Sequence, residues 1–121
     1  MKKNKQIIFR TLFFSATIAI IILAVLPSDK LTSTMKISDI LNHTMAFLTL
    51  SFLFRQSFPH KKNKVLFIYL SAYGGLIELI QFFLPWRSCD LKDLSVDITA
   101  ILAFIIISEI FKKGRYIESC Q

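Results

Sequence analysis

Four long apolar runs, separated by clusters of charged residues, dominate this sequence. They cover residues 7–26, 40–54, 65–84 and 94–111. A helix needs about 20 predominantly apolar residues, within a range of about 17–25, to cross the hydrocarbon core of a bilayer. Three of the runs reach that length directly, and the run at 40–54 reaches it when its helix begins near Ile37.

The apolar runs are not those of a soluble bundle, in which each helix keeps one polar face. The stretches TIAIIILAVL and ILAFIII are apolar on every side, and apolar residues make up 54% of the 121-residue chain. Neither an internal repeat nor a long linker divides the chain. We therefore predict an all-α integral membrane protein, a bundle of four transmembrane helices forming one domain over residues 1–121.

The first run follows Lys2, Lys3 and Lys5, a pattern that also introduces secretory signal peptides. It is longer than a typical signal-peptide core, and no clean small-x-small cleavage site precedes Pro27. We therefore expect it to stay in place as the first membrane span.

The basic residues predict the orientation of the bundle. They gather before the first run, in the stretch RQSFPHKKNK between the second and third runs, and after the fourth run, whereas the other two loops hold few. The positive-inside rule then places both termini in the cytoplasm and the loops at 27–38 and 85–93 outside. The net charge of +7 is mostly this topology signal and gives no indication of nucleic-acid binding.

Polar residues inside the apolar runs lie at a single depth under this topology. They occur at the outer end of the second, third and fourth helices and in the loop that joins the last two. Ionisable residues of membrane helices usually face the bundle interior and mark functional sites. The predicted ligand-binding residues are Asp39, His43, Glu78, Gln81, Arg87, Asp93 and Asp97.

Small residues accompany the polar ones on the third run, where Ser71, Gly74, Gly75, Glu78 and Gln81 form one stripe at helical spacing. Such stripes let membrane helices approach closely while polar side chains bond across the contact. This suggests a purely structural alternative, in which the polar residues lock the helices together at around 1 kcal/mol per hydrogen bond. Under that alternative Asp39 and Asp93 are helix N-caps.

The chemistry available to these residues is proton exchange and anion binding. His43 and Glu78 can exchange a proton, Arg87 can hold a phosphate or carboxylate, and Asp93 can orient the histidine. His43, Glu78 and Asp93 are thus the catalytic candidates, but no complete nucleophile–base–orienter set is present, and enzymatic activity stays open. A divalent ion held by His43, Glu78 and Asp93 is an alternative, since all three are metal-ligand types, yet nothing in their spacing selects a metal. The sequence therefore predicts neither metal nor cofactor.

The stretches SDILNHTMAFLTL and GGLIELIQFFLPWRSCDLKDLSVDITA resemble the VanZ-like family of small bacterial membrane proteins. The family pattern has an acid and a histidine opening one helix, then Gly-x-x-x-Glu-x-x-Gln, an Arg, and Asp-x-x-x-Asn-x-x-Gly. The resemblance covers residues 37–104 and matches Asp39, His43, Gly74, Glu78, Gln81, Arg87 and Asp93. Asp97 stands where the family has Asn, Ala100 where it has Gly, and Ile40 where a basic residue often follows the first acid.

The resemblance implies a location in the bacterial inner membrane and a link to the cell envelope. The family is named for a protein associated with teicoplanin resistance, so a role in glycopeptide resistance or envelope stress is one hypothesis. Our leading hypothesis is that the outward-facing polar site binds, with or without modifying it, an envelope-associated lipid or amphiphile. The alternative is a non-catalytic membrane adaptor whose polar cluster locks the helices or engages a membrane protein partner or a second copy.

The predicted orientation can be checked at the two cysteines. A membrane-impermeant thiol reagent applied to intact cells should label Cys89, in the predicted outer loop, and should label Cys120 only after the membrane is opened. Labelling of Cys120 but not Cys89 in intact cells would show the inverted orientation.

Overall fold

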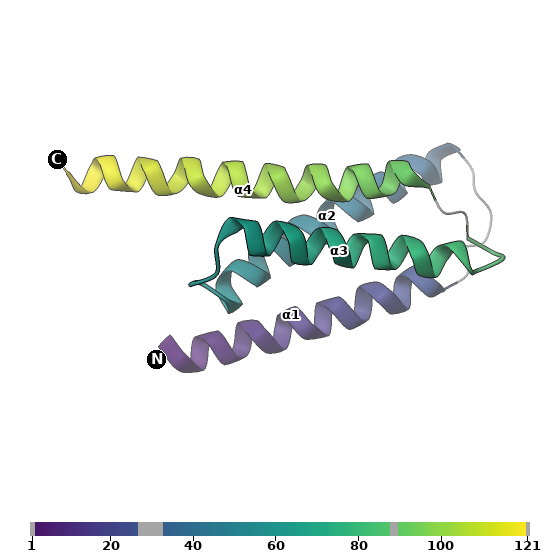
Figure 1. Cartoon of the computed structure of the whole chain (residues 1–121), viewed down its shortest axis with the longest axis horizontal. Helices are drawn as coiled ribbons and strands as arrows, with labels where there is room; N and C mark the ends of the chain where they lie inside the picture. The colour runs from purple at the N-terminus through teal and green to yellow at the C-terminus, as the bar shows by residue number, and fades with distance from the viewer. Residues whose placement is uncertain (1, 27–32, 88–89, 121) are drawn as a thin grey trace.

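A computed structural model of the chain describes residues 2–26, 33–87 and 90–120, without the side chains of residues 33–39. The described residues form four α-helices and no β-strand: α1 (Lys2–Val25), α2 (Ser33–Ser57), α3 (Asn63–Phe82) and α4 (Leu91–Ser119) (Figure 1). Each predicted apolar run coincides with one helix. The ends differ, because α2 begins before Ile37 and α4 continues past Phe111 as an exposed helical tail.

Three of the helices, α1, α3 and α4, are long and apolar enough to cross a membrane. Helix α2 is not among them, and its sequence carries charged or titratable residues such as Lys36, His43 and Arg55. Its 25 residues nevertheless extend about 37 Å, more than the roughly 30 Å hydrocarbon core. The all-helical class is therefore confirmed, while the fourth span and the sidedness of the termini stay predictions.

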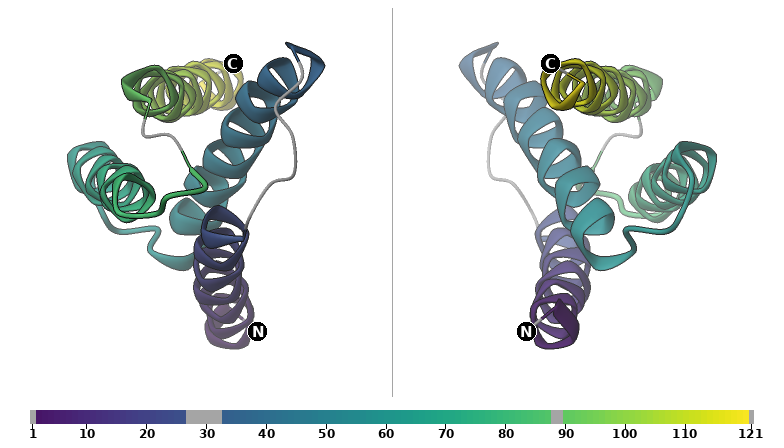
Figure 2. Two further views of the ribbon diagram at one scale, coloured as in Figure 1. Left: turned by 90° about the vertical axis from the view of Figure 1, so that its right-hand side faces the viewer. Right: turned by 90° about the vertical axis from the view of Figure 1, so that its left-hand side faces the viewer.

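Helix α2 lies at the centre of the bundle. In the end-on views it runs diagonally between α1 and α4, with α3 to one side (Figure 2). In the described part of the chain α1 and α4 do not touch, and each packs against α2 and α3 instead. The start of α1 and the end of α4 lie at the same end of the bundle (Figure 1).

The core is built from apolar side chains of all four helices. Phe13 of α1 is almost completely buried, and its ring meets that of Phe54 edge-on with the centroids 5.7 Å apart. Leu50, Leu70 and Ile101 are likewise buried. Many large apolar side chains face outward from the bundle, an arrangement suited to lipid and costly in water.

A polar contact ties α3 to α4 near the end of the bundle that holds the termini. Lys112 Nζ lies 3.2 Å from Glu109 Oε1, and Asn63 Nδ2 donates a hydrogen bond of 2.8 Å to the same oxygen. Spacing alone predicts the helical pair of Glu109 with Lys112.

Of the two glycines in the predicted small-residue stripe of α3, only Gly74 is required for a close contact with neighbouring helices. A Cβ atom added there would lie 3.1 Å from Asp97 Oδ2 on α4 and 3.4 Å from the Phe47 ring on α2. A Cβ atom on Gly75 would meet nothing within 4 Å. The predicted small-residue contact between membrane helices is therefore present at Gly74, whereas Gly75 lies outside it.

The two neighbouring glycines make a matched pair of variants. Gly74→Ala should destabilise the bundle by about 1–3 kcal/mol, because the fully buried Asp97 must move to admit the methyl group. Gly75→Ala should be neutral or slightly stabilising, since alanine has the higher helix propensity. The free energy of unfolding in mixed micelles tests this, and equal values for the two variants would contradict the close approach at Gly74.

Candidate functional site

A hydrogen bond between α2 and α4 anchors the candidate site. His43 Nδ1 lies 2.8 Å from Asp97 Oδ1. Asp97 is completely buried, and the His43 side chain is 19% exposed. A carboxylate at Nδ1 favours the tautomer with the proton on that nitrogen, which leaves Nε2 to accept a proton or bind a ligand.

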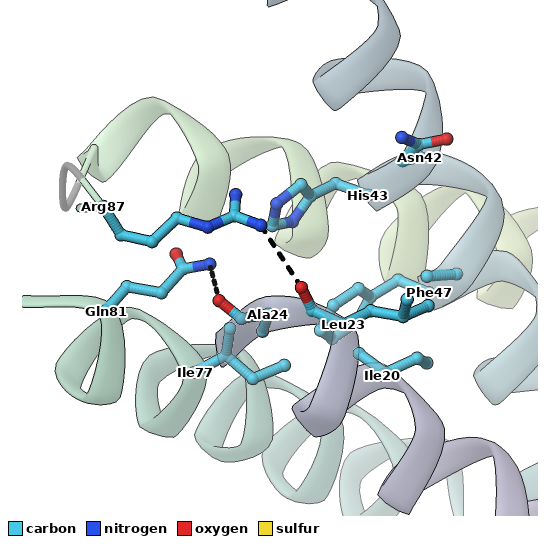
Figure 3. A pocket seen from close by; sticks show the side chains of 10 residues that line it. Ile20, Leu23, Ala24, Asn42, His43, Phe47, Ile77, Gln81 and Arg87 are labelled. Atoms are coloured by element: carbon cyan, nitrogen blue, oxygen red, sulfur yellow. Dashed lines mark hydrogen bonds between the residues drawn. The ribbon is translucent and has the colours of Figure 1, made fainter. Parts of the chain in front are cut away.

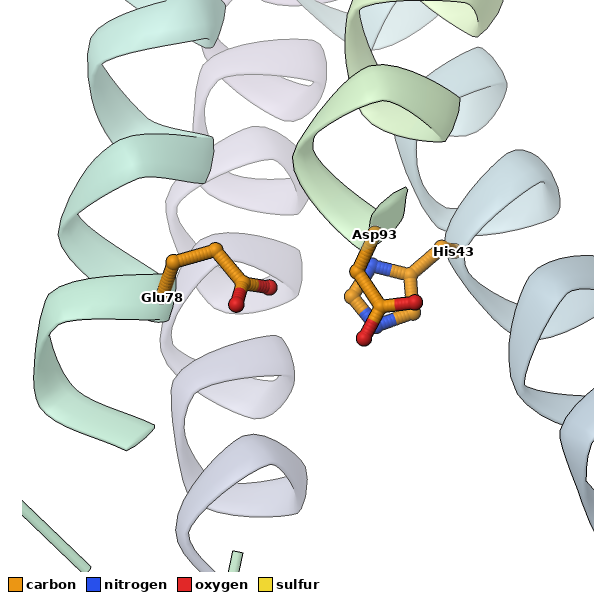
Figure 4. Close-up of side chains that lie close together, drawn as sticks. All are labelled: His43, Glu78 and Asp93. Carbon is orange, nitrogen blue, oxygen red and sulfur yellow. The ribbon is translucent and has the colours of Figure 1, made fainter. Parts of the chain in front are cut away.

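Glu78 and Asp93 converge on the same histidine from α3 and α4. Each of the three residues offers one ligand atom, and these atoms all lie within 4.8 Å of one another. Figure 4 shows the three side chains pointing toward one another from three different helices. Glu78 is only 4% exposed, while His43 and Asp93 are partly buried. Residues distant in sequence thus form one cluster. Asp93 lies in the first turn of α4, and α4 begins at the end of the bundle opposite the start of α1 (Figure 1).

Asp97, rather than Asp93, is the carboxylate that orients His43 at Nδ1. Asp93, which the sequence offered as the residue that orients the histidine, does not do so at Nδ1. Asp93 is not the N-cap of α4 either: Asp90 holds that position, and its side chain accepts a hydrogen bond of 3.0 Å from the backbone N–H of Lys92. One helical turn separates Asp93 from Asp97, so sequence position alone leaves both within reach of the histidine.

Two further predicted residues, Gln81 and Arg87, bind the backbone of α1. Gln81 Nε2 donates to the Ala24 carbonyl at 3.3 Å, and Arg87 Nη2 donates to the Leu23 carbonyl at 3.2 Å (Figure 3). Arg87 Nε and Nη2 also donate to the Leu26 carbonyl. The last carbonyls of a helix have no partner within the helix, and a cation there is favourable for the helix dipole.

Trp86 completes this cap through a hydrogen bond of 2.9 Å from Nε1 to the Val25 carbonyl. The sequence reasoning did not include Trp86. A tryptophan followed by an arginine just beyond an apolar run is typical of interfacial anchors, and that pattern is a signal for its role.

Asp39 belongs to α2, but its side chain lies outside the described part of the structure. The same holds for the whole of Cys89. Cys120 is the exposed C-cap residue of α4.

A cavity of about 460 Å³ lies beside the cluster and shares His43 with it. Most of its wall is apolar and comes from α1, α2 and α3, whereas its polar groups come from Asn42, His43, Gln81 and Arg87. Arg87 and His43 lie on one side of the cavity, with Ile20 and Ile77 on the other (Figure 3). The cavity thus offers an apolar surface and a polar one to a single occupant.

Comparison of the chain with protein-family models, curated proteins and solved structures finds no match. The motif residues named above are therefore the whole basis of the resemblance to the VanZ-like family.

Proposed function

We propose that this chain is a VanZ-like protein of the bacterial inner membrane that binds an envelope-associated lipid or amphiphile. The cavity beside His43 is the observation that carries the proposal. Its volume of about 460 Å³ is in the range of roughly 300–1,000 Å³ typical of small-molecule sites. An apolar wall with a few convergent polar groups suits a molecule that has a hydrocarbon part and a polar head.

The polar side of the cavity favours an anionic or hydrogen-bonding head group. Arg87 uses Nε and Nη2 for the carbonyls of Leu26 and Leu23, and a guanidinium carries further N–H donors on its other terminal nitrogen. Guanidinium groups bind phosphate and carboxylate well. His43 supplies a second polar contact from the same side (Figure 3). Chemical modification of the ligand is not part of the proposal.

We further propose that all four helices cross the membrane, with both termini in the cytoplasm. The start of α1 and the end of α4 lie at the same end of the bundle, which is in keeping with an even number of membrane crossings (Figure 1). Helix α2 presents Leu41, Met45 and Phe52 outward, as a lipid-facing helix does. With the basic residues on the cytoplasmic side, the cavity and the cluster belong to the outer half of the bilayer.

The adaptor alternative has its own support. The His43–Asp97 hydrogen bond and the bonds from Gln81 and Arg87 to α1 all hold helices together. Under this alternative the polar residues serve the bundle, and its surface engages a membrane protein partner or a second copy. Ligand occupancy of the cavity distinguishes the two functions.

Filling the cavity provides the test of ligand binding. The protein is extracted in mild detergent, and retained lipids are quantified by mass spectrometry against the bulk membrane. We expect one envelope lipid or amphiphile to be enriched with the parent protein. Ala46→Phe, which places a ring in the cavity wall, should lower that enrichment about tenfold, equivalent to about 1.4 kcal/mol.

Ala72→Phe is the matched control, because Ala72 is exposed on α3 and is not among the residues that line the cavity. It should leave the enrichment unchanged. Recovery of bulk phospholipid alone, in equal amounts from all three proteins, would contradict the ligand proposal and favour the adaptor.

A further inference from the structure

We propose that His43, Glu78 and Asp93 form a binding site for one divalent transition-metal ion of the zinc or manganese type. The ion would be held between α2, α3 and α4, each of which supplies one ligand. This inference goes beyond the lipid-binding proposal and does not depend on it.

The positions of the three side chains fit a preformed but open site. Their ligand atoms lie within 4.8 Å of one another. Ligands of a tetrahedral zinc ion, at bonds of about 2.0–2.1 Å, lie roughly 3.4 Å apart. A movement of about 1 Å by the carboxylate ends of Glu78 and Asp93 therefore closes the set around an ion.

The histidine is held as metal-binding histidines usually are. Such residues donate their other ring N–H to a carboxylate or carbonyl, which fixes the ring orientation and raises the basicity of the ligating nitrogen. Asp97 Oδ1 lies 2.8 Å from His43 Nδ1 and supplies this contact. Nε2 is then the nitrogen available to the ion, and Asp97 acts as a positioning residue outside the ligand set.

The charges of the cluster favour a cation. Glu78, Asp93 and Asp97 place three carboxyl groups around one imidazole, inside a bundle whose outer surface is apolar. Arg87 lines the neighbouring cavity and bonds to the Leu23 and Leu26 carbonyls, and even a protonated imidazole supplies only a single positive charge. A divalent ion supplies two, and bound cations are often the largest local charge where carboxylates gather.

The ligand types narrow the choice of ion. Imidazole suits zinc, copper, iron and nickel, whereas carboxylates also suit manganese, magnesium and calcium. One imidazole with two carboxylates therefore favours zinc or manganese over calcium, which takes six to eight oxygen ligands. Three protein ligands leave a position open, as in catalytic zinc sites. Because His43 also lines the cavity, the ion would lie at the cavity wall.

The sequence predicted no metal because the three ligands come from three helices. Metal motifs are recognised from short fixed spacings between ligands, and His43, Glu78 and Asp93 have none. The sequence predicts their common depth, but their approach to within 4.8 Å is seen only when the helices are packed together (Figure 4).

Direct binding to the full chain tests the proposal. The parent and all variants carry Cys89→Ser and Cys120→Ser, which remove thiols that would bind zinc outside the cluster. The detergent-solubilised protein is stripped with a chelator and titrated separately with zinc, manganese and calcium chloride, and bound metal is counted after desalting. We expect one zinc or manganese ion per chain and at least tenfold weaker binding of calcium.

Two variants and one control locate the bound ion. Glu78→Gln and Asp93→Asn keep the side-chain size and should each weaken zinc and manganese binding at least tenfold. Glu109→Gln removes a carboxylate that is paired with Lys112 outside the cluster, and it should bind as the parent does. No stoichiometric binding by the parent, or equal binding by parent and both cluster variants, would overturn the proposal in favour of a proton-sharing polar cluster.

Thermal melting keeps the result interpretable if one variant folds poorly. Because the ion binds the folded state, saturating zinc or manganese should raise the Tm of the parent by roughly 5 °C and that of Asp93→Asn by much less. Asp93 is only partly buried, so we expect its variant to fold without metal. A parent Tm that neither ion changes would count against the site.

Discussion

The contact between His43 and Asp97 is the interaction on which the rest of the site depends. It joins α2 to α4 through a 2.8 Å hydrogen bond, with the carboxylate completely buried. Removing one partner of such a buried pair leaves the other without compensation. In soluble proteins this lowers the free energy of unfolding by about 3–5 kcal/mol. The bond also fixes the imidazole, so Nε2 has a defined direction relative to Glu78 and Asp93.

Helix α3 is packed around this contact. The Oδ2 atom of Asp97 is buried against Gly74, where a side chain would crowd it. The absence of a Cβ atom at Gly74 lets α3 come close enough to place Glu78 beside the histidine, one turn further along the helix. The close packing of α3 at Gly74 is thus what brings Glu78 into the cluster.

To the cavity, helix α1 contributes apolar side chains and backbone carbonyls rather than polar side chains. Its carbonyls accept hydrogen bonds from Tyr73, Gln81, Trp86 and Arg87, which attach it along α3 and the segment after it. Backbone groups that lack a partner are costly in lipid, so these donors stabilise the end of α1. Gln81 and Arg87 line the cavity and also bond to these carbonyls, so a structural role for them is compatible with ligand binding.

Sequence reasoning could predict the helices and the grouping of His43, Glu78 and Asp93 toward one end of them, because both depend on hydropathy and on helical spacing. It could not decide whether Asp93 or Asp97 bonds His43, since that choice depends on how α4 is rotated against α2. Nor could it separate Gly74 from Gly75, which are adjacent in sequence but face different surroundings. The capping of α1 by Trp86 depends on the path of the chain after α3, for which apolar periodicity holds no information.

A double-mutant cycle between His43 and Asp97 tests the central claim most directly. The free energy of unfolding in mixed micelles is measured for the parent, His43→Ala, Asp97→Ala and the double variant. The account predicts a coupling energy of at least about 1 kcal/mol, because residues in direct contact are not additive. A cycle between Asp97 and His60, which is exposed in the turn between α2 and α3, should give additive values. Additivity within about 0.5 kcal/mol for His43 and Asp97 would contradict the contact and, with it, the site built around it.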